Sequence, residues 1–404
     1  MFQRGGAGPL KRVLSSAKKL DASFQTKVMK SLYTYHFNGI FSLKSNIPYF
    51  EGMLHSFRAA SDERGGSSST LAGTTNDPTH APPLALEFIQ DDSLEVSPSG
   101  KEKVNLMLYH DRESEAIEFL YPWFRPVCAR LEAMKSLGRV GFRFTFNKRY
   151  LTFSNIVAEG WELIDQLRSL LLLHLIRDRR MYMFHAAAVK LGDGDGILIP
   201  AFGNTGKTTT SWMLAKQHQL GAKFLTDEFA IVDSSGYCYG LPCSSVISSV
   251  TVKKFDIKLS RSQRVSMSIS DLKSKLLSTR FSPGGVKIYP DRIFETSPGA
   301  RINKLAIIQN GVDAVKTLNR KEALKRIKAI QDYEFGWKSN PYLLAESFFN
   351  NDLDISSVSA IENDFLNTFL ASIDDIYLVS SSKAEHYKAI LEEILPKSTT
   401  ATHR

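Results

Sequence analysis

The amino-acid sequence predicts an α/β protein that joins an N-terminal α+β region to a C-terminal domain of alternating strands and helices. After residue 180, short apolar runs bounded by turn residues alternate with segments of helical periodicity. One of these runs, residues 196–200, leads directly into a glycine-containing loop and a following helix. Before residue 180, strand patterns predominate and the order is less regular. We therefore expect a boundary between the two parts near residue 180.

The composition is that of a globular protein. The chain has 404 residues, of which 43% are apolar and 23% are charged. This length accommodates roughly two or three domains of about 150 residues each. The formal charge is 51 − 42 = +9, which suits an anionic partner but is also common in a chain of this length. These values exclude a mainly disordered chain, a collagen and a coiled-coil rod.

Cysteines and long apolar runs are scarce. The three cysteines are Cys128, Cys238 and Cys243, and none belongs to a CxxC pair. This usage argues against a disulfide framework or a structural zinc site, and it favours a reducing compartment. The sequence contains no run of about 18 apolar residues and no nucleic-acid-binding motif. We expect a cytoplasmic protein with no transmembrane segment and no nucleic-acid partner.

The first 83 residues differ in composition from the rest. Residues 1–58 form a basic N-terminal segment followed by short strands, and the basic part contains a single acid, Asp21. Its loosely helical apolar spacing fits three alternatives: a membrane-surface helix, an organelle transit peptide, or a helix that packs on the body of the protein. Residues 59–83 are rich in Gly, Ser, Thr and Pro, which predicts a flexible loop because such a segment buries little apolar surface.

The remaining chain divides into an α+β region at 84–180, a second domain at 181–397 and a tail at 398–404. In the first, we expect strands at 84–89 and 104–110, a helical segment at 126–136, a hairpin of 141–146 with 150–153, and a helix at 159–179. In the second, we expect strands at 183–190, 196–200, 224–232, 304–309 and 375–379, and helices at 208–217, 320–330 and 384–395.

A phosphate-binding loop is the strongest functional signal in the sequence. Residues 201–208 (AFGNTGKT) fit the pattern A/G-x-x-x-x-G-K-S/T, with Ala201 in place of the more usual first glycine. In such a loop, backbone N–H groups turn inward to form an anion cradle, and the following helix directs its positive end at the phosphates. Lys207 would reach the outer phosphates and Thr208 would coordinate Mg²⁺. The expected nucleotide-binding residues are Gly203, Asn204, Thr205, Gly206, Lys207, Thr208 and Thr209. The alternative is a glycine-rich turn without a ligand.

Two further positions bear chemistry suited to a phosphate site. Asp227 and Glu228 begin a turn 20 and 21 residues after Lys207, at the start of an apolar segment. Phosphoryl transfer needs a carboxylate for Mg²⁺ and often another to accept the proton of the attacking hydroxyl. His185 lies on the strand before the loop strand. Alone, Asp227 and Glu228 fit a solvated acidic turn equally well, and His185 is more typical of a packing residue.

Together these elements resemble the C-terminal domain of HPr serine kinase, a family within the phosphoenolpyruvate carboxykinase-like P-loop kinases. The resemblance rests on the order His185-Ala-Ala-Ala-Val, Gly196-Ile-Leu-Ile, Gly203-Asn-Thr-Gly-Lys-Thr and Leu225-Thr-Asp-Glu. It spans roughly residues 181–397 and, more narrowly, is similar to divergent HPr-kinase-like members. It implies a carboxykinase-like P-loop kinase domain with a variable N-terminal α+β region.

The resemblance also implies roles for single residues. Asp227 becomes the proton acceptor for the target hydroxyl, Thr208 and Glu228 become Mg²⁺ ligands, and His185 lies near the transferred phosphoryl group. It further implies ATP as the phosphoryl donor and a homo-oligomeric assembly. The second acid is Glu228 where the family usually has Asp, and the glycine-rich stretch with which HPr kinases engage HPr is absent. The sequence therefore does not indicate HPr as the acceptor.

A phosphoryl-transfer site also needs cations for the charge that develops in transfer. Arg292 and Arg301 flank the segment before the strand at 304–309, and Arg280 and Lys287 lie nearby. We expect Arg292 and Arg301 to stabilise phosphate, the alternative being ordinary surface charges. The expected function is an ATP- and Mg²⁺-dependent kinase that phosphorylates a hydroxyl of a protein, a peptide or a small metabolite. The alternative is a nucleotide-binding regulatory module, or an ATPase without a phosphoryl acceptor.

Overall fold

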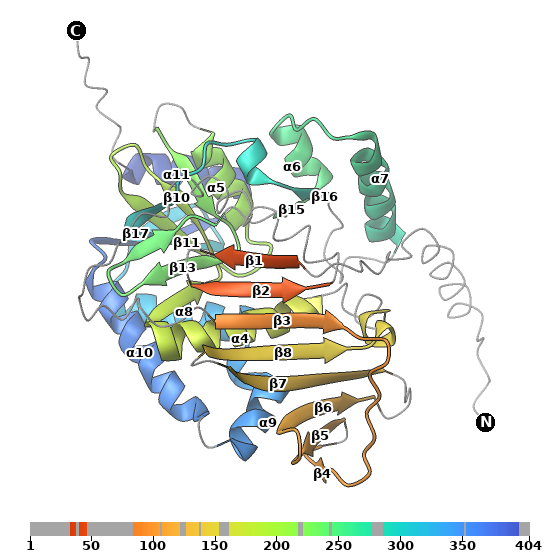
Figure 1. Cartoon of the computed structure of the whole chain (residues 1–404). Coiled ribbons are helices and arrows are strands. Elements are labelled where there is room, and N and C mark those ends of the chain that lie inside the picture. The colour runs from red at the N-terminus through yellow and green to blue at the C-terminus, as the bar shows by residue number, and fades with distance from the viewer. Residues whose placement is uncertain are drawn as a thin grey trace, which may run out of the picture.

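The protein is a mixed α/β structure with two large mixed sheets (Figure 1). The structure is a computed structural model that describes residues 33–37, 40–46, 84–105, 107–121, 127–136, 139–152, 161–216, 221–241, 245–276, 286–350 and 353–395. The basic part of the N-terminal segment, the loop expected at 59–83 and the tail at 398–404 lie outside the described residues. Among the helices it describes, none is long and apolar enough to cross a membrane.

The first sheet contains eight strands in the order β1-β2-β3-β8-β7-β6-β5-β4. Strands β2, β3 and β8 are parallel neighbours, and the other pairs are antiparallel. The strands are β1 (Tyr33–Phe37), β2 (Phe41–Ser45), β3 (Leu84–Gln90), β4 (Glu102–Lys103), β5 (Leu108–Asp111), β6 (Ala116–Leu120), β7 (Cys128–Ser136) and β8 (Arg139–Phe146).

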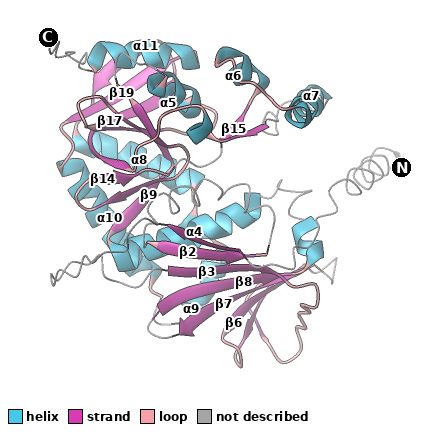
Figure 2. Cartoon of the chain, turned by 45° about the horizontal axis from the view of Figure 1, so that its top comes forward, coloured by secondary structure: helices cyan, strands magenta, loops and turns pink. Residues whose placement is uncertain are grey.

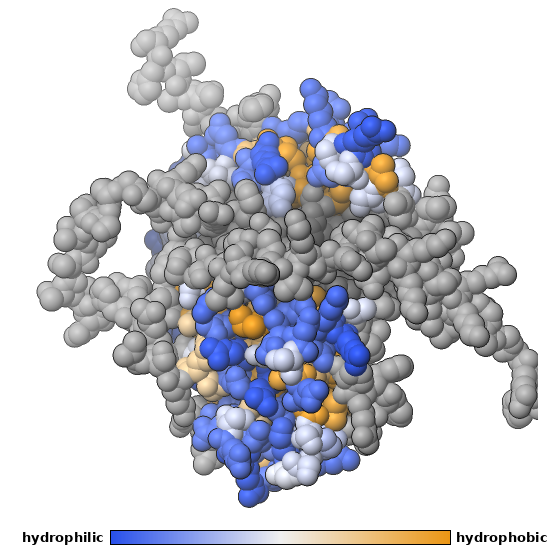
Figure 3. Space-filling view, turned by 45° about the vertical axis from the view of Figure 1, so that its right-hand side comes forward, coloured by the Kyte–Doolittle hydropathy of each residue, from blue (hydrophilic) through white to orange (hydrophobic). Residues whose placement is uncertain are grey.

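Alternation of apolar and polar residues explains the central strands of this sheet. In β3, Leu84, Leu86 and Phe88 are buried, whereas the residues between them are half-buried. Successive side chains of a strand point to opposite faces, so this pattern directs one face into the core and the other toward water. On the face of the molecule in Figure 3, hydrophilic residues predominate among those described, and hydrophobic ones form small separate groups.

Two expectations for this region are wrong. The segment expected to be helical at 126–136 is strand β7. In the register of this strand, Arg130 is opposite Glu118 of β6, and Glu132 is opposite Arg143 of β8. The helix propensity of its residues is outweighed by hydrogen-bonded pairing with a strand on each side. The hairpin expected beyond residue 146 is instead a helical turn at 148–152. The Asn147 side chain accepts a hydrogen bond from the backbone N–H of Tyr150 (2.9 Å), the pattern of a helix N-cap.

The second sheet contains nine strands and follows the order β12-β10-β11-β17-β14-β13-β9, with β19 and β18 continuing from β17. Strand β17 joins its two halves, because its first residues pair with β14 and its later residues pair with β11 and β19. The strands are β9 (Met181–Phe184), β10 (Ala186–Lys190), β11 (Gly196–Pro200), β12 (Lys223–Thr226), β13 (Ala230–Asp233), β14 (Tyr237–Tyr239), β17 (Gly299–Asn310), β18 (Ala314–Thr317) and β19 (Asp375–Ser381).

A two-stranded sheet and the helices complete the described structure (Figure 2). The small sheet pairs β15 (Ser245–Ile247) with β16 (Val286–Ile288). The α-helices are α4 (Trp161–Arg179), α5 (Lys207–Ala215), α6 (Ser249–Lys254), α7 (Arg261–Leu276), α8 (Arg320–Glu334), α9 (Pro341–Phe349), α10 (Ile355–Ala371) and α11 (Ala384–Ile394), with short 3-10 helices η3 (Pro290–Arg292) and η4 (Trp337–Ser339). The helices expected at 159–179, 208–217, 320–330 and 384–395 are thus confirmed within a few residues.

Elements from either side of residue 180 pack across the junction of the two sheets. Helix α4 precedes residue 180 but packs on β9 and α10 of the second part. Conversely, α9 packs on β5 and β6 of the first sheet, where Tyr342 makes an edge contact with Phe144. One hydrophobic core of the described residues continues through both parts. Residue 180 therefore separates the two sheets in sequence, but the packing continues across it.

Candidate functional site

Two expected strands are each divided in two, and both divisions fall at the residues with functional chemistry. The strand expected at 183–190 breaks at His185, between β9 and β10. The strand expected at 224–232 breaks after β12, so that Asp227 and Glu228 lie in the connection to β13. Strand β10 pairs with β12, whereas β9 pairs with β13. The two chain segments thus separate at the same point, and their polar residues face a common space.

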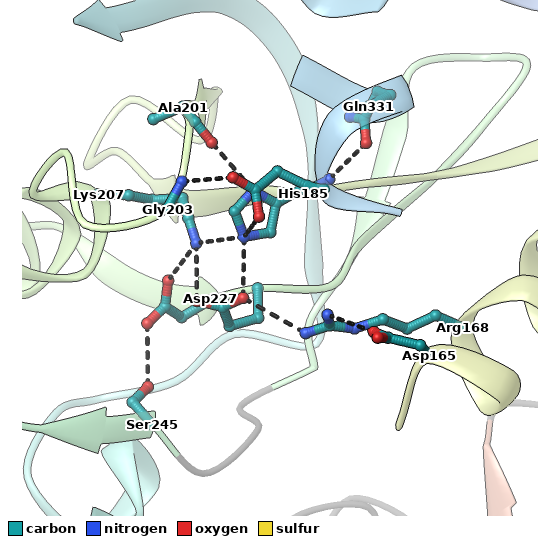
Figure 4. Close-up of polar contacts among 11 residues, drawn as sticks. Asp165, Arg168, His185, Ala201, Gly203, Lys207, Asp227, Ser245 and Gln331 are labelled. Atoms are coloured by element: carbon teal, nitrogen blue, oxygen red, sulfur yellow. Dashed lines mark hydrogen bonds and ion pairs between the residues drawn. The ribbon is translucent and has the colours of Figure 1, made fainter. Parts of the chain in front are cut away.

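The register places this space at the end of β11 from which the glycine loop (residues 201–206) emerges. Ala186 is opposite Pro200 in the antiparallel pairing of β10 with β11. Strand β12 runs antiparallel to β10, and therefore in the same direction as β11. The end of β12, the beginning of β10 and the glycine loop consequently meet at one edge of the sheet. Figure 4 shows the side chains of His185, Lys207 and Asp227 converging there.

The glycine loop has the backbone features of an anion cradle. Asn204 and Gly206 have φ angles of 61° and 108°, the left-handed region that turns successive N–H groups to one side. Gly206 is the N-cap of α5, and no side chain caps the helix there. The first N–H groups of α5 are therefore available to an anion. Gly203 and Asn204 are exposed, whereas Thr205 is buried.

Lys207 is buried at the centre of the cluster. Its Nζ lies 2.9 Å from Glu228 Oε1 and 3.6 Å from Asp227 Oδ1. Burial alone would lower the pKa of Lys207, but the attraction of Glu228 and Asp227 outweighs it and raises the pKa above its ordinary value. The lysine is therefore held as a cation at the mouth of the glycine loop, as a phosphate-neutralising residue requires.

Glu228 has an unusual backbone conformation, and its side chain has several charged partners. Its φ angle is 75°, which is uncommon for a residue with a side chain and is typical of functional sites. Removal from water would raise the pKa of Glu228, but Lys207 and His185 lower it well below its ordinary range. Arg168 contributes a further ion pair, with Nη2 3.6 Å from Glu228 Oε2. The carboxylate is therefore ionised throughout the neutral range.

His185 joins the glycine loop to the acidic pair. Its Nδ1 lies 2.9 Å from the carbonyl oxygen of Ala201, and its Nε2 lies 2.9 Å from Glu228 Oε2. The same Nε2 lies 3.3 Å from Lys207 Nζ, so the ring lies between the loop carbonyl, the carboxylate and the lysine. The backbone N–H of His185 donates to Gln331 Oε1 of α8 (3.0 Å), which fixes the point where β9 and β10 separate. The histidine is thus part of the cluster and not an isolated packing residue.

Asp227 is buried, yet one of its oxygens accepts no hydrogen bond. Oδ2 accepts a hydrogen bond from Ser245 Oγ on β15 (3.0 Å). Oδ1 is shielded from solvent and, among the described residues, has only the longer ion pair with Lys207. A buried carboxylate oxygen without a donor is costly unless a ligand or a proton donor completes it. Within the described cluster, this oxygen is positioned to accept a proton or contact a metal.

Four side chains of the site were not expected from the sequence: Arg168, Ser245, Gln331 and Glu334. Arg168 comes from α4, and its guanidinium lies 4.9 Å from the ring centre of Phe229 and 5.5 Å from that of Phe335. An arginine in an otherwise leucine-rich helix was the available signal for it. Glu334, the last residue of α8, accepts a hydrogen bond from the N–H of Gly203. Nothing local in the sequence distinguishes Ser245, Gln331 or Glu334 from ordinary polar residues.

The two arginines expected to stabilise phosphate lie elsewhere. Arg301 is exposed at the start of β17, next to Gly196 in the parallel pairing with β11, and so at the opposite end of β11 from the glycine loop. Arg292 is exposed in η3, where its guanidinium stacks 4.8 Å from the ring centre of Tyr289. Neither contacts the cluster in the described structure. Arg280 lies outside the described residues, and the side chain of Lys287 is not described.

The residues present fit a metal that arrives with a nucleotide. Among the described residues, no group of three or more His, Cys, Asp or Glu side chains is arranged to hold a metal alone. Mg²⁺ keeps several waters and usually takes one or two carboxylates together with substrate phosphates. Asp227 Oδ1, Glu228 and the Thr208 hydroxyl, in the first turn of α5 beside Thr209, provide this kind of partial ligand set.

No model of a known protein family matches the chain. No curated protein matches its sequence at a significant level.

Proposed function

We propose that the protein is an ATP- and Mg²⁺-dependent kinase of the carboxykinase-like P-loop class. It would transfer the γ-phosphoryl group to a hydroxyl of a protein, a peptide or a small metabolite. The observation that carries this proposal is the convergence of Lys207, Asp227 and His185 at the glycine loop. The resemblance of this order of residues to HPr-kinase-like proteins supports the same assignment.

Each part of the proposed reaction has a group suited to it. The N–H groups of the glycine loop and of the first turn of α5 receive the phosphates, and Lys207 neutralises the outer ones. Bound Mg²⁺ would neutralise phosphate charge, with Thr208 and Glu228 on the side of the protein. Asp227 Oδ1, which is buried and accepts no hydrogen bond from the described residues, is the proton acceptor.

In the proposed transfer, every bond that forms or breaks and the proton that is released are accounted for. The acceptor oxygen forms a bond to the γ-phosphorus while the bond from that phosphorus to the oxygen bridging the β-phosphate breaks. ADP leaves with that electron pair, and the hydroxyl proton passes to Asp227. Ser245 orients Asp227 through its other oxygen. His185, whose Nε2 lies 2.9 Å from Glu228 Oε2, would lie beside the phosphoryl group.

The test is nucleotide binding, compared between the wild type and Lys207→Ala. We expect Mg²⁺-dependent ATP binding that Lys207→Ala abolishes, because the variant leaves two carboxylates facing the phosphates without their cation. Lys216→Ala is the matched control: Lys216 is the exposed C-cap of α5, and it contacts the ring of Phe255 rather than the cluster.

Unchanged ATP affinity in Lys207→Ala, or no ATP binding by the wild type, would overturn the proposal. Binding followed by ADP release without an acceptor would indicate an ATPase. Binding without any turnover would indicate a nucleotide-binding regulatory module.

A further inference from the structure

A carboxylate from a distant part of the chain lies in the glycine loop. Glu334 Oε1 accepts a hydrogen bond from the backbone N–H of Gly203 at 2.6 Å. Its other oxygen, Oε2, lies 3.8 Å from His185 Nε2. Loop amides of this kind bind phosphate oxygens, and a carboxylate likewise offers negatively charged acceptor oxygens. The loop therefore already holds an anion, supplied by the last residue of α8.

The position of this carboxylate within the loop identifies the phosphate that it replaces. Gly203 lies three residues before the N-cap of α5, so it is at the end of the loop away from the helix amides. The carboxylate is close to His185, whose Nε2 is 3.3 Å from Lys207 Nζ. These are the groups that the proposed function assigns to the outermost phosphate. Glu334 is thus on the reacting side of the cradle.

We infer that Glu334 occupies the place of the transferred phosphoryl group and makes the site discriminate against nucleoside triphosphates relative to diphosphates. This inference rests on the proposed function. A diphosphate fills only the part of the cradle near α5 and leaves Glu334 on Gly203. The terminal phosphoryl of a triphosphate needs the same N–H group, so it must displace the carboxylate or lie against it. The carboxylate and the phosphoryl group are both negatively charged, and like charges in contact repel strongly when they are partly shielded from water.

The local structure lets Glu334 leave without unfolding its helix. Glu334 ends α8, and Gly336, two residues on, adopts a left-handed conformation with φ of 50°. The side chain of Glu334 is partly open to solvent, at 16% exposure. Rotation about its own side-chain bonds is sufficient to turn the carboxylate outward. The exchange is therefore a competition between two anions for one amide.

The test compares the affinities of wild type and Glu334→Gln for ADP and for a non-hydrolysable ATP analogue, both with Mg²⁺. Gln is nearly the same size and can still accept from Gly203, but it carries no charge. We expect Glu334→Gln to bind the ATP analogue about tenfold more tightly, with a change for ADP of less than about twofold. Asp332→Asn is the matched control, because Asp332 is on the same helix and pairs with Lys338 instead (3.2 Å). It should leave the ratio of the two affinities unchanged.

The outcomes separate this inference from the proposed function. An equal gain for both nucleotides, an unchanged ratio, or weaker binding of the ATP analogue by Glu334→Gln would overturn the role of Glu334 and leave the nucleotide site standing. Absence of binding to either nucleotide in both forms would overturn the two together. Glu334→Ala controls for an effect of the new glutamine side chain. It removes the carboxylate without adding another polar group, so it should change the ratio of the two nucleotide affinities by the same factor. Thermal unfolding of each variant establishes that it is folded.

Discussion

Each of the two parts of the described structure holds a glutamate between cations, and the two clusters differ in how completely the charges are matched. In the first sheet, Glu118 of β6 is fully buried, with Arg130 contacting one oxygen and Lys101 the other. In the second part, Glu228 lies between Lys207 and His185, with Arg168 at one side. The two carboxylates thus have similar partners.

The backbone and the neighbours of the two glutamates are not alike. Glu118 lies in a regular strand, directly opposite Arg130 in the register of β6 with β7. Glu228 has a left-handed backbone and is 31% exposed, and it adjoins a second acid, one oxygen of which accepts no hydrogen bond from the part of the chain that the structure describes. A cluster whose charges are all matched stabilises the fold, whereas an incompletely matched one leaves groups for a ligand. The predictions below test this distinction.

The largest effect is expected at Asp227. Asp227→Asn keeps the hydrogen bond from Ser245 within reach but removes the proton acceptor, so turnover should fall by about a thousandfold with nucleotide affinity largely kept. Phosphoryl transfer and nucleotide binding, measured on the same preparation, check this. Ser245→Ala is the companion variant, because it affects only the orientation of the carboxylate and should lower turnover less. Turnover at the wild-type rate in Asp227→Asn would remove Asp227 from the reaction.

The corresponding change in the first sheet should affect stability and not activity. Glu118→Gln leaves Lys101 and Arg130 without their common anion, and the free energy of unfolding should fall by about 3 kcal/mol. Nucleotide binding by the folded variant should equal that of the wild type. Urea unfolding and ATP titration together measure both quantities. Loss of ATP affinity in the folded variant would contradict the view that this cluster is purely structural.

The sequence predicted elements best where a local pattern matched the final environment. The apolar run at 196–200 is β11, and the capping box of Asn319 with Glu322 begins α8 at the expected place. The helix expected at 126–136 failed, because its residues favour helix locally but pair along two strand edges in the fold. The hairpin at 147–149 failed because Asn147 caps a helical turn instead. Local propensity carries no information about pairing partners that are distant in sequence.

The same limit applies to the candidate site. Lys207, Asp227, Glu228 and His185 were predicted because a motif and its spacing mark them, and the structure brings all four together. Arg168, Gln331 and Glu334 come from α4 and α8, whose packing against the second sheet no short motif encodes. Arg292 and Arg301 were chosen for proximity along the chain. The parallel register of β11 with β17 places Arg301 at the other end of the strand.

A smaller effect is expected at Arg168, the cation that α4 contributes to the second cluster. Arg168→Met keeps the packing on Phe229 and Phe335 but removes the attraction that holds Glu228 from one side. Turnover should fall by about tenfold, with a smaller change in nucleotide affinity. Arg168→Lys restores the charge without the planar stacking, so it should recover part of the loss. A purely structural arginine would instead lower the free energy of unfolding and leave the turnover of the folded protein unchanged.

The smallest effect is expected at Asp178, near the C-terminal end of α4. Burial by itself would raise the pKa of Asp178, but hydrogen bonds from His174 (2.6 Å) and Arg177 lower it from 3.8 to about 2. A lowered native pKa stabilises the fold above the unfolded pKa, and this contribution is lost as the pH falls from 3.8 toward about 2.

Asp178→Asn should therefore lower the free energy of unfolding by about 1 kcal/mol at neutral pH. The difference between the two proteins should shrink at about pH 3, because the wild-type carboxylate begins to bind protons in the unfolded chain. Urea unfolding at both pH values measures this. A difference that stays constant with pH would mean that the substitution perturbs packing rather than charge.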